Sequence, residues 1–160
     1  MAGSVSTIVE LPPLLRTSDF RVLIGKREVA CSEISRLSSA TDPTPPPTES
    51  AHGFETVVLR RALTASTELY DWRRAIIGGK QDLRPVTIQQ LASADGAVVN
   101  AWRLEDAWPC RWSGPAFNAM GSDVAIEEVE LAFADLVWLP AAPDPPKARR
   151  PDTRATTKGA

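Results

Sequence analysis

The clearest structural signal in the chain is AWRLEDAWPCRWSGPAFNAMGSDVAIEEVELAFADL, residues 101–136. Its first part places Trp102, Trp108 and Trp112 within eleven positions. Large aromatic side chains at this density are typical of a core or an interface. Its last part alternates apolar and polar residues, as a strand with one buried face does. The stretch therefore indicates a β-rich protein with an aromatic packing surface.

Residues 124–137 are expected to form a single strand. Their apolar residues fall on even positions before the pair Glu127-Glu128 and on odd positions after it. Because side chains alternate faces along a strand, this change of phase predicts a β-bulge at the two glutamates.

Two further regions upstream also predict strands. Residues 20–31, FRVLIGKREVAC, alternate around Gly25-Lys26 and predict a hairpin. Residues 54–63, FETVVLRRAL, are rich in β-branched and apolar residues and predict a strand that ends at the solvent edge with Arg60-Arg61.

A second hairpin is predicted around Asp95-Gly96, a dipeptide that tolerates the positive φ angles of a tight turn. Residues 84–91 and 97–107 flank this turn and are expected to be antiparallel strands. Together with the other segments they predict a mainly β fold, a barrel or sandwich, whose open edges must be paired with something.

One helix is predicted over residues 66–77. It begins at a serine that can cap it, and a glycine pair follows its last residue. Leu69, Trp72 and Ile76 share one face of this helix, and we expect that face to pack onto the sheet.

Two segments are expected to lie outside the packed core. Residues 38–53 hold four prolines among small polar residues and predict an exposed, extended loop. Residues 140–160 are rich in proline, with five basic and two acidic side chains, and predict a flexible basic tail. The predicted organisation is one domain over residues 1–139, followed by the tail.

The bulk composition is that of a soluble globular protein. Of the 160 residues, 43% are apolar and 24% charged, and the formal net charge is −2. The first residues have no positive region followed by an apolar run, so no signal peptide is predicted. No window approaches the roughly 18 apolar residues of a membrane span, so we expect a cytoplasmic protein that does not bind membranes by itself.

The sequence offers no constellation for catalysis. Its one histidine, His52, falls in the proline-rich segment, and its two cysteines, Cys31 and Cys110, have no metal-ligand spacing. The acidic run 127–130 is not framed by aromatic or basic groups as a pair of catalytic carboxylates would be. We therefore predict no catalytic, cofactor-binding or metal-binding residues and no enzyme activity.

The stretch quoted above resembles the C-terminal half of the phage tail-tube family, shared by myophage tails and extracellular contractile injection systems. In that family an aromatic-Pro pair leads through Lys/Arg-Trp-x-Gly-Pro and an Asn to a strand of Val-Ala-Ile-Glu type. The matching residues here are Trp108, Pro109, Arg111, Trp112, Gly114, Pro115, Asn118, Val124, Ile126, Glu127, Glu130 and Leu131. The likeness extends over most of residues 20–136.

The resemblance implies a β-barrel or sandwich that associates as hexameric rings, which stack into an inner tube. It implies sheath and baseplate proteins as partners, a channel for toxin cargo or phage DNA, and no cofactor. The motif residues would then serve the fold and the interface, with Glu128 and Glu130 as candidates to face the channel. We also expect the strand over residues 124–137 to pair partly along a seam between subunits.

Residues 38–53 depart from the family, because the loop there usually carries a Tyr-Arg-Glu-Gly-like stretch. This departure leaves open an adaptor ring of the same fold, a tube initiator or baseplate component, beside the bulk tube subunit. A third alternative is an unrelated β-sandwich that binds carbohydrate or peptide with its tryptophans. The sequence does not decide between a phage and an injection particle.

Overall fold

The computed structural model describes residues 15–39, 54–92 and 95–140. The predicted proline-rich loop, apart from its first two residues, lies outside the described residues. So do His52 and all of the predicted tail except Pro140, which ends the last strand.

Within these residues the chain forms eight strands and one helix, as the sequence predicts for a mainly β fold. The helix is α1 (Glu68–Ile77). The strands are β1 (Phe20–Ile24), β2 (Arg27–Val29), β3 (Glu33–Ile34), β4 (Glu55–Ala62), β5 (Arg84–Leu91), β6 (Val98–Ser113), β7 (Ile126–Phe133) and β8 (Asp135–Pro140).

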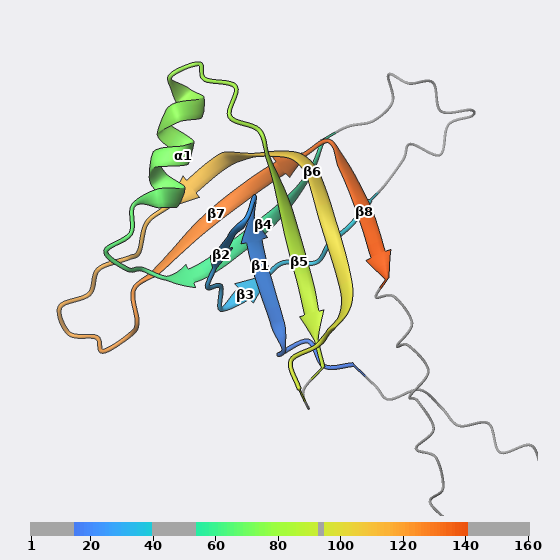
Figure 1. Cartoon of the computed structure of the whole chain (residues 1–160). Helices are drawn as coiled ribbons and strands as arrows, with labels where there is room; N and C mark the ends of the chain where they lie inside the picture. The colour runs from blue at the N-terminus through green and yellow to red at the C-terminus, as the bar shows by residue number, and fades with distance from the viewer. Residues whose placement is uncertain (1–14, 40–53, 93–94, 141–160) are drawn as a thin grey trace, which may run out of the picture.

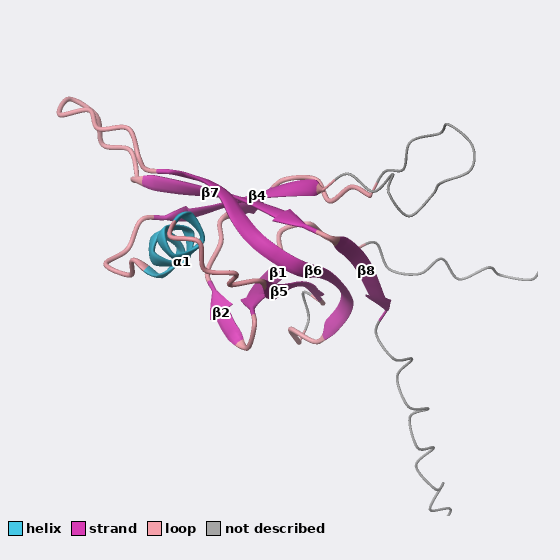
Figure 2. Ribbon diagram, turned by 90° about the horizontal axis from the view of Figure 1, so that it is seen from above, coloured by secondary structure: helices cyan, strands magenta, loops and turns pink. Residues whose placement is uncertain are grey.

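All the pairings between these strands are antiparallel, in the order β2-β1-β5-β6-β7-β4-β3, with β8 beside β6. Seen from above, β4 and β7 form one layer and β1, β2 and β5 lie in another (Figure 2). The long strand β6 crosses from one layer to the other. Its first part pairs with β5 and β8, and its last part pairs with β7.

The predicted strand 97–107 is longer than expected, because β6 continues through Trp108-Pro109 to Ser113. Besides an irregularity between Val98 and Asn100 at its start, two more change the phase of β6 on the way. The first lies at Asp106, whose φ of 50° is positive, and the second follows Pro109. A bulge bends a strand and tolerates proline, so β6 can serve both layers.

The bulge predicted at Glu127-Glu128 is wrong. Strand β7 pairs with β4 in unbroken register over its whole length, from Glu55↔Phe133 to Ala62↔Ile126. The odd positions of β7 point inward throughout, and Glu127 occupies one of them. The apolar pattern therefore shifts in the sequence only because this inward residue is a glutamate. The segment is also two strands, β7 and β8, rather than one.

The predicted seam between subunits is not along β7. This strand lies between β4 and β6 of the same chain, so both of its edges are paired over most of its length. Within the predicted segment 124–137, β8 is the part that has a described neighbour on one side alone, so a seam along β8 stays a prediction.

Both predicted hairpins are present. Strands β1 and β2 meet at Gly25 (φ 62°), and β5 and β6 meet at Gly96 (φ 70°). Both backbone angles lie in the left-handed region that glycine adopts without strain.

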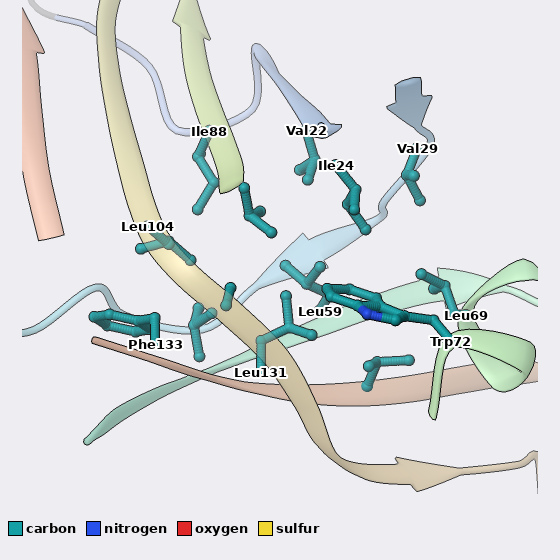
Figure 3. Packing of buried hydrophobic residues seen from close by; sticks show 14 residues of the cluster. Val22, Ile24, Val29, Leu59, Leu69, Trp72, Ile88, Leu104, Leu131 and Phe133 are labelled. Carbon is teal, nitrogen blue, oxygen red and sulfur yellow. The ribbon is translucent and has the colours of Figure 1, made fainter. Parts of the chain in front are cut away.

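The helix packs on the sheet through the expected face. Leu69 and Trp72 are buried in the core (Figure 3). Ile76 is partly buried and packs against it. The indole Nε1 of Trp72 donates a hydrogen bond to the carbonyl of Asp82 at 2.8 Å. The guanidinium of Arg84 lies 4.8 Å from the ring centroid and forms a two-point ion pair with Asp82.

Replacing Trp72 with Ala should lower the free energy of unfolding by about 3–5 kcal/mol, because it leaves a large cavity under the helix. Urea denaturation followed by circular dichroism measures this. The matched control is Ile77→Ala on the same helix, where the side chain is 58% exposed; we expect a loss of at most about 0.5 kcal/mol there. Equal losses in the two variants would contradict the packing described.

Candidate functional site

A buried ion pair joins the two central strands of one layer. Arg61 of β4 is 8% exposed and Glu127 of β7 is 2% exposed, and the two residues are register partners. The Nε of Arg61 donates to one carboxylate oxygen of Glu127. The indole Nε1 of Trp112 donates to the other oxygen at 2.8 Å. An ionised carboxylate tolerates burial only when it is paired and hydrogen-bonded in this way.

This arrangement corrects the expectation that Arg60-Arg61 ends its strand at the solvent edge. Arg60 is half exposed, but Arg61 points inward. Its second nitrogen, Nη2, donates to the carbonyl of Ser66 at 3.2 Å, just before α1. The ion pair therefore connects β4, β7, the end of β6 and the approach to the helix.

Two neighbours complete this polar cluster. Tyr70 of α1 packs edge-on against Trp112, with ring centroids 5.1 Å apart. Cys31 is half-buried nearby, and burial raises the pKa of its thiol to about 11. A thiol with this pKa stays protonated at neutral pH and is a poor nucleophile.

The Trp-x-Gly-Pro motif forms the base of a protruding loop. We call residues 114–125, between β6 and β7, the arm (Figures 1 and 2). A Cβ atom at Gly114 would lie 2.9 Å from Cη2 of Trp112, so only glycine lets the indole lie against the chain here. The returning strand of the arm is held by the amide of Leu63, which donates to the carbonyl of Ala125 at 2.8 Å.

The tip of the arm is a defined turn. The side-chain oxygen of Asn118 accepts a hydrogen bond from the amide of Met120 at 3.0 Å. Its backbone carbonyl accepts one from Gly121 at 3.1 Å. Such turns are a usual role of asparagine. This turn leaves Phe117 89% exposed and Met120 95% exposed.

The outward face of the same layer carries alternating charges. Arg60 Nε lies 2.8 Å from Glu128, and Arg60 Nη1 lies 3.0 Å from Glu33. In the next row Arg111 is the register partner of Glu130. We call this surface the charged face; it comprises Val58, Arg60, Arg111, Ser113, Glu128 and Glu130.

The remaining motif residues divide between the core and the surface. Pro109 and Leu131 are fully buried, whereas Val124 is exposed on the arm and Ile126 is half-buried at the start of β7. Trp108 lies outside the core and packs edge-on against Phe54, with centroids 4.8 Å apart.

Sequence reasoning missed Arg61 as the partner of Glu127, and also the exposed pair Phe117 and Met120. The sequence does carry a signal for Arg61. Val57 and Leu59 alternate as inward residues, and Arg61 is the next residue in that alternation. The arm offers no comparable periodicity.

The two ends of one layer are open strand edges. Among the described strands, β2 pairs only with β1, and β8 pairs only with β6. Trp138 of β8 is 62% exposed and stacks on Trp102, with centroids 6.3 Å apart. Unpaired N–H and C=O groups along such edges are able to pair with another chain.

Within residues 15–39, 54–92 and 95–140 no group of three or more His, Cys, Asp or Glu is placed to hold a metal ion. No helix in this part of the chain has the length and hydropathy of a membrane span. Every buried side-chain nitrogen and oxygen among the described residues has a hydrogen-bond partner.

The model of the T4-like virus tail tube protein gp19 family matches residues 16–137. The anti-feeding prophage cap (AFP tube terminating cap) has the same fold, with a TM-score of 0.75 and 17% identity over 88% of this chain and 100% of that chain. A chain of the PVC sheath-tube complex in its extended state gives a TM-score of 0.71 and 22% identity over 88% and 100%.

Hcp1 from Flavobacterium johnsoniae is more distant, with a TM-score of 0.54 and 13% identity over 76% of this chain and 95% of that chain. A comparison with curated proteins finds no match.

Glu127→Gln should lower the free energy of unfolding by about 3–5 kcal/mol, because it leaves Arg61 charged and buried without its carboxylate. The adjacent Glu128→Gln is the matched control, since Glu128 and its ion-pair partner Arg60 are both half exposed, and we expect a loss of at most about 1 kcal/mol. Urea denaturation of the two variants decides the matter; a similar loss in both would contradict the buried pair.

Cys31 should react slowly with iodoacetamide in the folded protein. Because its pKa is raised to about 11, the thiolate fraction at pH 7.5 is small, and we expect alkylation about a hundredfold slower than in urea. The rate should rise as the pH approaches 11. Mass spectrometry of a Cys110→Ser variant isolates this thiol, and equal rates in folded and unfolded protein would refute the expectation.

Proposed function

The chain belongs to the family of the T4-like virus tail tube protein gp19, and we propose that it is a structural subunit that forms six-membered rings of the inner tube of a contractile injection particle or phage tail. The observation that carries the proposal is the extent of the family match. Residues 16–137 include every described element from β1 to the first half of β8. On this proposal the motif residues act through the fold and the interfaces rather than through a reaction.

The open edges support ring formation. Strands β2 and β8 end the same layer on opposite sides, in the order β2-β1-β5-β6-β8. We infer that the β8 edge of one copy pairs with the β2 edge of the next. An interface between two different surfaces of one chain repeats around an axis and closes as a ring when the rotation allows. Each ring then stacks on another to make the tube.

The charged face is our proposal for the wall of the channel. With the layer of β2 and β8 on the outside, Glu128 and Glu130 turn toward the axis together with Arg60 and Arg111. Alternating signs keep the wall hydrated and offer no apolar patch to which cargo would adhere. Toxin cargo and phage DNA both remain candidates for the content of this channel, and sheath and baseplate proteins for the outer partners in an assembled particle.

A second candidate is a ring of the same fold at the end of the tube or at the baseplate. The observation that favours it is the proline-rich sequence over residues 38–53, in place of the Tyr-Arg-Glu-Gly-like stretch usual in the family. A terminal ring needs to stack on one side only, so it does not require the loop that packs rings on both sides.

Electron microscopy of the full chain, co-expressed with sheath and baseplate proteins, tests the proposal. We expect six-fold rings in the tube or at its end. Leu139→Lys places a charge on the β8 edge and should abolish rings while leaving the circular dichroism spectrum unchanged. Ile77→Lys, at an exposed helix position, is the matched control and should still assemble. A chain that stays monomeric and absent from particles would refute the proposal.

A further inference from the structure

An apolar groove is lined by residues from the C-terminal end of α1, the bulge in β6 and the β7–β8 corner. These elements lie at the top of the molecule in Figure 1. The volume of the groove is about 460 Å³, and its walls include Phe54, Ile76, Leu83 and Trp108. Phe54 is 66% and Leu83 48% exposed. Large apolar side chains gathered at one place on a surface commonly mark a contact with another molecule.

The tip of the arm is the second uncovered apolar feature. Phe117 and Met120 project from a turn that Asn118 fixes, on a loop whose base is held by Trp112 and Gly114. A loop ordered before it binds loses little conformational entropy on binding. Phenylalanine and methionine are also residues that fill apolar grooves well.

The arm and the groove lie at opposite ends of the molecule. In Figure 1 the arm projects at the lower left, whereas the helix C-terminus and the β7–β8 corner are at the top. The arm of a chain therefore does not reach the groove of the same chain, and the partner of each surface must come from another molecule.

We propose that the arm of one copy inserts Phe117 and Met120 into the groove of a neighbouring copy. This inference rests on the proposed self-association and names a second contact for it. Both halves of the contact are on one chain, as a head-to-tail interface requires. The groove carries one charge of each sign, Lys80 and Asp106, and the arm carries one charge, Asp123, so the contact does not join two surfaces of like net charge.

The proposal gives the buried ion pair a role in assembly. Glu127 holds Trp112, and Trp112 lies against Gly114 at the base of the arm. The cluster therefore sets the direction in which the arm leaves the sheet. The arm reaches the groove of the neighbouring copy only when it leaves the sheet in this direction.

Photo-crosslinking in the assembled particles tests the contact. A benzophenone amino acid at position 117 should give covalent dimers of the chain, with crosslinked peptides that contain Leu83 or Trp108. The same probe at position 138, on β8, reports the strand seam and serves as the control. Crosslinks from position 117 to a sheath or baseplate protein, or to another region of the chain, would overturn the proposal.

Substitutions separate this contact from ring formation in general. Phe117→Ser combined with Met120→Ser should raise the protein concentration needed for half-maximal assembly about tenfold or more, since two apolar side chains are no longer buried. Ile77→Ser, an exposed apolar position outside both the arm and the groove lining, should leave that concentration within about twofold. Equal assembly by the wild type and the double variant refutes the arm contact alone, whereas a wild type that forms no rings refutes the proposed function with it.

Discussion

The rest of the structure depends on one buried ion pair. Arg61 and Glu127 face each other across β4 and β7, and each has a further hydrogen bond that brings in Ser66 or Trp112. A charge buried at this place requires its partner, so the pair fixes the register of the two strands. It also decides where β6 ends, because Trp112 must reach the carboxylate. These four residues, Arg61, Glu127, Ser66 and Trp112, therefore also position the segment before α1 and the base of the arm.

The second constraint is the length of β6, which must belong to both layers. The irregularity at Asp106 lets both Leu104 and Ala107 reach the core, and the one after Pro109 lets Trp112 pack against it. The surfaces that we propose to act in assembly follow from this geometry. One layer is left with open edges at β2 and β8, the other with an alternating row of charges on its outer side, and the loop after β6 projects as the arm. None of these surfaces requires a reactive group, which fits a protein that works by assembly.

The sequence predicts most of the elements, because hairpins, the amphipathic helix and alternating strands depend on local patterns. It also leads to the family, through a motif whose tryptophan and glycine are explained by one contact, the indole lying on Gly114. What it does not predict depends on partners distant in the chain. Glu127 suggests a β-bulge when the sequence is considered alone, because a glutamate is not expected at an inward position. Its inward position is explained only by Arg61, 66 positions away, which lies opposite it. In the same way Phe117 and Met120 belong to a loop without periodicity, and only the folded chain reveals their exposure.

The central claim is that this chain functions by forming rings with its own copies. Native mass spectrometry of the purified full-length protein tests that claim most directly, since it counts the copies in each assembly. The account predicts a species at six times the 17.3 kDa mass of the chain, together with stacked multiples at higher concentration. A single monomeric species at every concentration, or a discrete oligomer with another number of copies, would contradict it.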